Sequence, residues 1–273
     1  MDLFCELGPW AYAISLKKEI LKRHVKNFFT KEKFATRQDS TFLPVVVWSY
    51  KGDMIKRGPG IDPELQQNKA DNIRKACEGI HGLIIKPGES FSFWQRVGKT
   101  SKKNGFKEGR VIENGKLISG VGGGLCNLAN SLHLAVMHSP MEVTELHHHS
   151  DALAPDPEGV RKPYSAGTSV NYNFLDFRFV NPTDVAVQLV AYCEGSNLIV
   201  ELRSEKSFPY QYRIIEEDHH FHKENNDLFY RRSKIYRETI DKENDRVVAR
   251  ELKRDNRSRV MFDPSLIPSS QIR

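Results

Sequence analysis

One cysteine follows three consecutive glycines in the middle of the chain, directly before a segment in which apolar residues recur at helical spacing. These residues are Gly122, Gly123, Gly124 and, two positions later, Cys126. Glycine permits backbone angles that are closed to other residues and lets another group approach closely. In the first turn of a helix, unpaired N–H groups and the positive end of the helix dipole favour a cysteine thiolate. The pattern predicts a nucleophilic Cys126, with backbone amides of residues 124–127 forming an oxyanion hole.

Three consecutive histidines, His147, His148 and His149, follow on the next predicted strand. Strand alternation would place His147 and His149 on the same side. His133, on the helix itself, lies about 10.5 Å from Cys126 along the axis at about 1.5 Å per residue. That separation is too long for a nucleophile–base hydrogen bond of about 2.6–3.2 Å. The general base is therefore expected among the three histidines, in the order seen in papain-like and transglutaminase-like thiol enzymes, an analogy of layout alone.

Other roles for these residues stay open. A cysteine on a buried helix face is often a small apolar core residue. The histidine run could be the solvated end of a strand. It could also bind zinc, with His147, His149 and Cys126 as ligands, although no fourth ligand and no standard zinc spacing are present. No metal and no other cofactor is therefore predicted.

Composition excludes several classes of protein. The chain has 273 residues, of which 39% are hydrophobic and 28% charged, so it can bury a core and is not disordered as a whole. Its net charge of +6 is mildly basic, and basic residues alternate with acidic ones, which gives no support for specific nucleic-acid binding. The four cysteines are far apart, without the spacing of a zinc ribbon. No stretch is apolar for long enough to predict a transmembrane segment.

The beginning of the sequence predicts an amphipathic helix. Between residues 13 and 29, apolar residues recur at helical spacing with lysines and arginines between them. We expect this helix to dock on the protein through its apolar side and to expose a basic face; binding to a membrane surface is the alternative. No secretory signal is recognised, so the expected location is cytoplasmic, or peripheral at the membrane.

The remaining elements predict an α+β fold. It consists of a mostly antiparallel sheet with a packed central helix, an N-terminal helical region and a β-rich C-terminal tail. A helix should begin at Asp62-Pro63 and end near residue 79. We expect regions at residues 1–69, 70–205 and 206–273. Strands are expected at residues 43–50, 81–86, 90–94, 110–113, 116–119, 141–146, 169–181, 183–194 and 198–203, with shorter ones at 210–215, 233–239 and 246–249.

Two of these expectations concern connections between strands. Asn114-Gly115 is a strong hairpin dipeptide, because both residues tolerate positive φ angles. The strands at 169–181 and 183–194 are expected to pair with each other across Asn181-Pro182.

Three motifs give the chain a resemblance to a known family. PGESFSFW at 87–94, KEGRVIENGKLISGVGGGLCNLANSLH at 107–133 and LDFRFVNPTD at 175–184 resemble the VanW family in order and spacing. The resemblance covers about residues 70–205 and is closest to the compact form of the family. It implies a role in glycopeptide (vancomycin) resistance or in cell-wall metabolism.

The resemblance also implies site residues. The glycine–cysteine motif of the family falls on Gly122–Gly124 and Cys126, its regular histidine on His149, and the acidic residue of its LDF strand on Asp176. Two positions depart from the family pattern. Asn127 stands where glutamine is usual, and Gly167 stands where an aspartate is usual.

Two functions of different classes follow. The first is a cysteine-dependent hydrolase or acyl/peptidyl transferase acting on cell-wall peptides, with Cys126 as nucleophile and His149 as general base. Because Gly167 cannot orient the histidine, Asp176 or Asn171 would have to do so. The second is a noncatalytic module that binds a cell-wall peptide or a partner protein. In either case Asn127 and Asn130 join the three glycines as candidate substrate-binding residues. The oligomeric state is not predicted.

Overall fold

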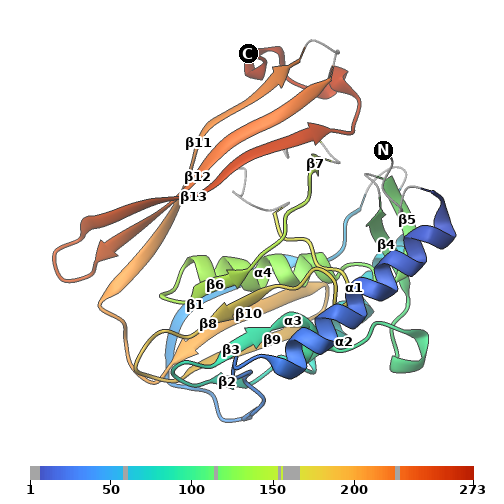
Figure 1. The fold of residues 1–273 in the computed structure, drawn as a ribbon. Coiled ribbons are helices and arrows are strands. Elements are labelled where there is room, and N and C mark those ends of the chain that lie inside the picture. The colour runs from blue at the N-terminus through green and yellow to red at the C-terminus, as the bar shows by residue number, and fades with distance from the viewer. Residues whose placement is uncertain (1–6, 58–60, 114–115, 153–154, 156–166, 225–227) are drawn as a thin grey trace.

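The computed structural model describes residues 7–57, 61–113, 116–152, 155, 167–224 and 228–273. Four α-helices and thirteen strands lie in this part of the chain (Figure 1). The helices are α1 (Pro9–Phe29), α2 (Pro63–Cys77), α3 (Phe93–Val97) and α4 (Leu125–Met137). The strands are β1 (Val45–Asp53), β2 (Leu83–Ile85), β3 (Ser90–Ser92), β4 (Glu108–Glu113), β5 (Lys116–Val121), β6 (Glu142–Glu145), β7 (Asp151–Ala152), β8 (Arg178–Val180), β9 (Val187–Glu194), β10 (Asn197–Ser204), β11 (Tyr210–Lys223), β12 (Phe229–Asp241) and β13 (Arg246–Val260).

The strands form separate sheets. The central sheet has the order β1-β10-β9-β2, and the C-terminal sheet has the order β11-β12-β13-β7. A smaller sheet, β3-β8-β6, and the hairpin β4-β5 complete the described strands. All of these pairs are antiparallel except β13 with β7, which is parallel. The predicted α+β fold with mostly antiparallel sheets is therefore confirmed.

Helix α4 lies between the central and C-terminal sheets, which makes it the centre of the fold (Figure 1). On its side toward the central sheet, Leu128 and Leu132 are fully buried in the main hydrophobic core. Near its C-terminal end, Met137 packs with Ile235 of β12 in a second, smaller cluster. The apolar spacing predicted a buried helix here, and the two clusters show that it contacts apolar side chains of both sheets.

The start of α2 agrees with the prediction from the sequence, whereas the start of α3 was not predicted. At α2, the Asp62 carboxylate accepts hydrogen bonds from the backbone amides of Glu64 and Leu65, which is the expected N-terminal cap. The strand expected at 90–94 is shorter. The Ser92 hydroxyl accepts a hydrogen bond from the amide of Gln95 at 3.3 Å and thereby starts α3.

The expected pairing of residues 169–181 with 183–194 is wrong. Strand β8 pairs with β3 and β6, whereas β9 belongs to the central sheet. Asn181 explains the separation, because its buried side-chain amide donates to the carbonyls of Ile85 and Val185 at 2.9 and 2.8 Å. These hydrogen bonds fix a turn that carries the chain from one sheet to the other. The hairpin dipeptide Asn114-Gly115 joins β4 to β5 but lies outside the described residues.

The C-terminal region is more regular than its sequence suggested. Instead of short strands, β11, β12 and β13 extend over 14, 13 and 15 residues. They form a long sheet on the far side of α4 from the central sheet (Figure 1).

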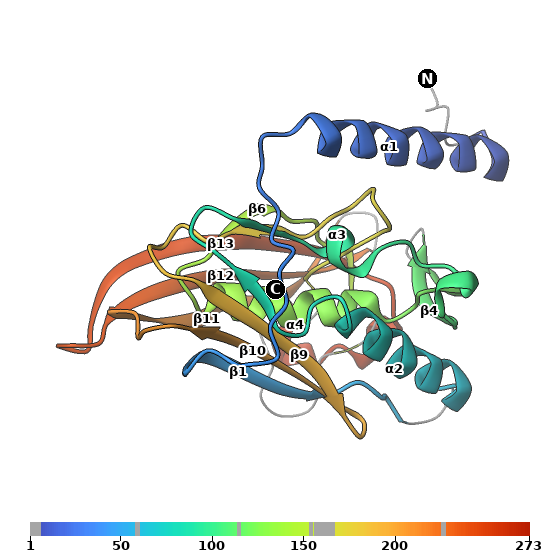
Figure 2. The same ribbon diagram turned by 90° about the horizontal axis from the view of Figure 1, so that it is seen from below.

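Helix α1 has the expected helical structure but not the expected orientation. Figure 2 shows it along the outside of the molecule. Arg23 and Asn27 contact the protein through hydrogen bonds, whereas Ile14, Leu21, Val25 and Phe28 are exposed. Within the described part of the chain, no helix combines the length and apolar composition needed to cross a membrane.

Candidate functional site

The glycine run forms the turn that leads into α4. Gly122 and Gly124 have φ angles of 86° and 102°, in the region that favours glycine. A Cβ atom at Gly122 would lie 2.9 Å from Cβ of Thr100, so the position is also closed to a side chain by packing. Gly123 is buried, and its carbonyl accepts a hydrogen bond from the side chain of Asn72 at 3.0 Å. These contacts give all three glycines a role in the turn itself.

Cys126 lies in the first turn of α4, as the sequence predicted, but its environment favours the thiol. The sulfur donates a hydrogen bond to the carbonyl oxygen of Val170 at 3.7 Å. Burial, the largest cause, raises the pKa of Cys126. The expected thiolate is therefore not the resting form, because loss of hydration outweighs the favourable position at the helix start.

The histidine run does not continue a strand. β6 ends at Glu145, and His148 forms an isolated bridge with Thr168. His147 contacts the Glu145 carboxylate through Nε2 at 3.0 Å. His149 donates its backbone amide to the carbonyl of Gly167 at 3.2 Å. Among the hydrogen bonds of the described residues, none joins these rings to Cys126.

Gly167 contacts the histidines through its backbone. Its carbonyl oxygen lies 2.9 Å from Nδ1 of His148, and the Arg254 guanidinium approaches the same nitrogen at 3.1 Å. When protonated, this ring nitrogen donates to the carbonyl, and when unprotonated it accepts from the guanidinium, so it can form only one of the two hydrogen bonds at a time. Burial, together with the charge of Arg254, lowers the pKa of His148 to about 4. Burial and Arg254 also lower the pKa of His149. Both rings are therefore neutral at pH 7.

Asp176 is fully buried in a hydrogen-bond network. It accepts hydrogen bonds from the Ser92 hydroxyl at 2.6 Å, the Trp94 amide at 3.1 Å and Nε of Arg178 at 2.7 Å. These bonds connect β3, α3 and β8, and none of them goes to a histidine. Asn171 is exposed, and its backbone forms a bridge with Leu175. The orienting role expected of Asp176 or Asn171 stays a prediction.

The two candidate asparagines of α4 differ in their surroundings. The amide of Asn127 bonds the carbonyl of Gly124 at 2.9 Å, as part of the first turn. The side chain of Asn130 accepts a hydrogen bond from the Thr168 hydroxyl at 3.5 Å, and that hydroxyl lies 3.1 Å from Nδ1 of His133. His133 is buried, and burial lowers its pKa to about 3. This neutral imidazole is therefore part of the packing between α4 and the segment at Thr168.

No group of histidine, cysteine and carboxylate side chains in the described ranges is arranged to hold a metal ion. The zinc alternative with His147, His149 and Cys126 thus gains no support from the geometry.

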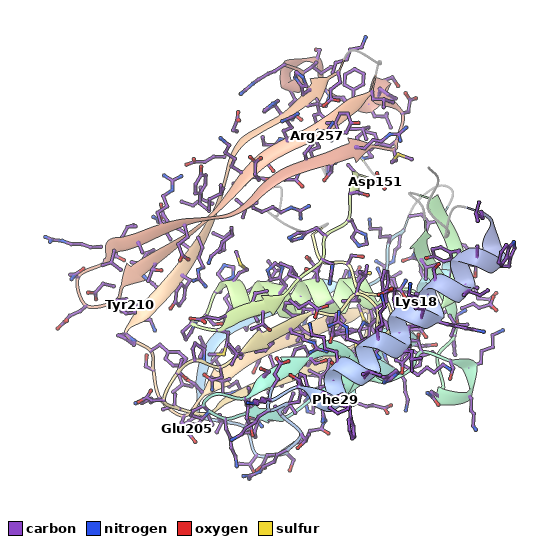
Figure 3. The ribbon with its side chains drawn as sticks, viewed as in Figure 1. Lys18, Phe29, Asp151, Glu205, Tyr210 and Arg257 are labelled. Atoms are coloured by element: carbon purple, nitrogen blue, oxygen red, sulfur yellow. The ribbon has the colours of Figure 1, made fainter. Side chains whose placement is uncertain are left out.

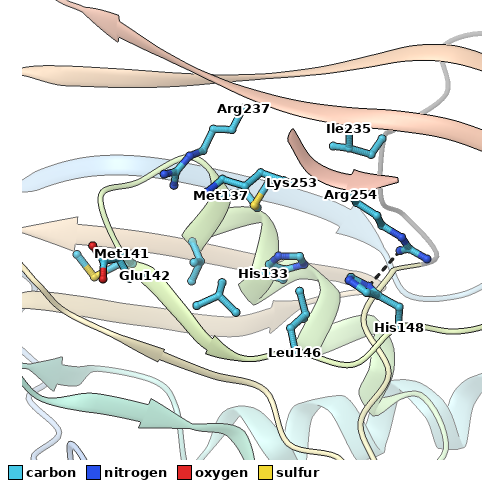
Figure 4. A pocket seen from close by; sticks show the side chains of 12 residues that line it. His133, Met137, Met141, Glu142, Leu146, His148, Ile235, Arg237, Lys253 and Arg254 are labelled. Carbon is cyan, nitrogen blue, oxygen red and sulfur yellow. Dashed lines mark hydrogen bonds between the residues drawn. The ribbon is translucent and has the colours of Figure 1, made fainter. Parts of the chain in front are cut away.

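A cavity of about 380 Å³ lies between the C-terminal half of α4, the region of β6, and strands β12 and β13 (Figure 4). It is lined by His133, Val136, Met137, Met141, Glu142, Val143, Leu146, His148, Ile235, Arg237, Lys253 and Arg254. Seven of these residues are apolar side chains or histidines of the segment from α4 to His148, and Glu142 is the eighth residue from that segment. None of the predicted substrate-binding residues is in this lining.

The cavity combines apolar and cationic groups. Arg237 and Lys253 contact the same carboxylate, that of Glu251, at 3.0 and 2.8 Å. Arg254 reaches His148, as the dashed line in Figure 4 marks. Three cationic residues and the one carboxylate of Glu142 therefore border a largely apolar space. Sequence reasoning missed these cations, because Arg254 is 106 residues from His148 and lies in a tail that is charged throughout.

The comparisons with known proteins give the family. The family model described as VanW like protein matches residues 68–203. The chain belongs to the VanW family. It is 28% identical over 172 residues to "Vancomycin B-type resistance protein VanW" of Enterococcus faecalis, covering 63% of this chain and 62% of that protein. It is also 28% identical over 138 residues to "Uncharacterized protein YoaR" of Bacillus subtilis, covering 50% of this chain and 44% of that protein.

The chain thus spans less than two thirds of the length of either relative. No solved structure matches it, so the papain-like layout stays a prediction. The matched region includes the glycine turn, α4 and the histidine run, whereas the cavity also uses β12 and β13, which lie beyond residue 203.

Cysteine reactivity tests the VanW-family motif directly. We expect iodoacetamide at pH 7 to alkylate Cys193 faster than Cys126, because a hydrogen bond from Cys77 lowers the pKa of Cys193 while burial raises that of Cys126. Mass spectrometry of the peptides gives the rate for each cysteine. Faster alkylation of Cys126 than of Cys193, slowed by His149→Ala, would contradict this expectation and favour a nucleophilic cysteine.

Proposed function

We propose that this VanW-family protein is a noncatalytic module that binds the carboxylate-bearing end of a cell-wall peptide in the cavity beside α4. The observation that carries the proposal is the combination of a largely apolar cavity of about 380 Å³ with three cationic residues at its border. Small-molecule and peptide sites are typically apolar, with a few polar groups that fix the orientation of the ligand.

The two parts of the cavity suit the two parts of such a ligand. Val136, Met137 and Leu146 offer surface to short apolar side chains, and methionine adapts its shape readily. Arg254 comes from the opposite wall, β13, and can receive the carboxylate, whereas Lys253 of the same strand is paired with Glu251. An arginine–carboxylate contact is directional and charge-assisted, so it would fix the end of the peptide.

The name of the E. faecalis relative supports a role connected with the cell wall. Because that protein is called a vancomycin resistance protein, we propose a role for this chain in glycopeptide resistance or cell-wall metabolism. A cysteine-dependent hydrolase or transferase is the second candidate, favoured by the position of Cys126 directly after the glycine turn. Binding is the better-supported function, because the Cys126 sulfur is hydrogen-bonded to the Val170 carbonyl and, among the hydrogen bonds of the described residues, not to a histidine.

Substitution of Arg254 tests the proposal. We expect Arg254→Gln to weaken binding of a short alanine-rich peptide with a free carboxylate by about tenfold or more, since a charge-assisted hydrogen bond contributes about 1.5–3 kcal/mol. Titration calorimetry gives the Kd. The same peptide with an amidated C-terminus should bind the unsubstituted protein about as weakly as the acid peptide binds the variant.

Arg246→Gln is the matched control. Arg246 is exposed at the start of the same strand, outside the cavity lining, so its loss removes the same charge without touching the site. Equal weakening by both substitutions would show a general charge effect and contradict a specific site. Equal affinity for the acid and amidated peptides would contradict carboxylate recognition.

A further inference from the structure

Helix α1 presents an apolar face to solvent. At about 100° per residue, Trp10, Ile14, Leu21, Val25 and Phe28 fall within an arc of about 60°. All of them are exposed, and the exposed fractions of Phe28 and of the adjacent Phe29 are 83% and 77%. A helix at the surface of a globular protein normally turns such a face toward the core. Contiguous apolar surface of this kind indicates a binding surface.

The opposite side of α1 is held to the protein by polar contacts. Arg23 forms two hydrogen bonds of 2.6 Å with the carboxylate of Glu145, at the end of β6. The side chain of Asn27 accepts a hydrogen bond of 2.7 Å from Arg178. The Arg23 and Glu145 side chains are 14% and 17% exposed, so this ion pair is largely shielded from water. These contacts fix the orientation of α1 with its apolar face outward.

Lysines border the apolar face. On the same helical projection, Lys17 lies on one side of the face, and Lys18 and Lys22 lie on the other. Lys18 and Phe29 are labelled on α1 in Figure 3. Glu19 is the acidic residue of the helix, and Lys22 pairs with it at 2.7 Å. An apolar face with aromatic residues near both ends and lysines along its edges is typical of helices that lie in a membrane interface.

We propose that α1 binds the surface of an anionic lipid bilayer, with its apolar face among the lipid chains and its lysines at the phosphates. The charges favour this occupant over a second copy of the protein. An antiparallel or parallel pair of α1 helices would bring the bordering lysines of both copies together, whereas anionic headgroups attract them. The inference does not depend on the ligand of the cavity.

Vesicle flotation tests the proposal with the full chain. We expect the protein to float with vesicles of one part phosphatidylglycerol to two parts phosphatidylcholine, and much less with pure phosphatidylcholine. The double variant Phe28→Ser/Phe29→Ser should bind the anionic vesicles at least about tenfold more weakly. The free energy gained when two phenylalanine side chains move from water into the lipid is then lost. Lys17→Gln/Lys18→Gln should weaken binding to anionic vesicles and reduce its dependence on salt.

The control variant is Val248→Ser/Leu252→Ser, which removes two exposed apolar side chains from β13. It should float like the unsubstituted protein, and circular dichroism should show that every variant is folded. Absence of flotation with anionic vesicles would overturn the proposal, as would equal flotation of the phenylalanine variant. Sedimentation that shows a dimer, broken by the phenylalanine substitutions and insensitive to vesicles, would also overturn it in favour of self-association.

Discussion

Asp176→Ala is expected to lower the free energy of unfolding by about 3–5 kcal/mol, because it removes the nearest of the three carboxylates around the buried Arg178 and leaves two further buried donors without their acceptor. The side chain of Arg178 is 5% exposed, and its Nε donates to Asp176 at 2.7 Å. The substitution also removes the acceptor of the Ser92 hydroxyl and the Trp94 amide. A loss of this size is a large share of the roughly 5–15 kcal/mol that stabilises a typical domain.

Urea unfolding at pH 7 measures this effect. Asp176→Asn keeps the shape and one acceptor oxygen, so it should be destabilised less than Asp176→Ala. The control is Asp184→Ala, since Asp184 is an exposed partner of Lys206 and its loss should leave the unfolding curve unchanged within error. If Asp176→Ala unfolded at the same urea concentration as the control, the carboxylate would not be structural, and the orienting role predicted from the sequence would gain support.

Acid should destabilise the protein through His133. Burial lowers the pKa of this residue from 6.5 to about 3. Between these values the unfolded chain binds a proton that the folded protein excludes, so the free energy of unfolding decreases as the pH falls below 6.5. By pH 4 the loss from this group is about 3 kcal/mol. Above pH 6.5 the group contributes no pH dependence.

Comparison of variants separates the contribution of His133 to the loss of stability in acid from the contribution of the carboxylates. His133→Gln should reduce the loss of stability between pH 7 and pH 4, as measured by urea unfolding at both values. His148→Gln provides the matched comparison, with a reduction of nearly the same size over this range, because the pKa of His148 is lowered to about 4. An unchanged pH dependence in His133→Gln would show that the imidazole is not excluded from protonation in the folded protein.

Local chemistry predicted the parts of the fold that depend on neighbouring residues. The cap at Asp62 and the glycine turn before α4 were recognised because their hydrogen bonds and backbone angles involve residues a few positions apart. The separation of β8 and β9 into different sheets was not recognised, since it depends on the contact of Asn181 with Ile85, which is almost a hundred positions away in the sequence. Hydrophobic spacing showed which residues of α1 share a face. It could not show which face contacts the protein, because that depends on Glu145 and Arg178.

The candidate site was predicted in part for the same reason. The motif around Cys126 is contiguous, so the position of the cysteine at the start of a helix could be read directly. Whether its sulfur is hydrated depends on Val170 and the packing around it, which the spacing of residues does not reveal. The cationic wall of the cavity comes from β12 and β13, whose approach to α4 is a property of the assembled sheets.

The strand order of the central sheet also determines when this protein can finish folding. Among the described strands, β1 pairs with β10 alone. Residues 45–53 therefore cannot join the central sheet until residues 197–204 have been made. Contacts of such long sequence separation slow folding. During synthesis from the N-terminus, the central sheet therefore closes only after Ser204 has left the ribosome, and strands β11, β12 and β13, which are made last, are added to it afterwards.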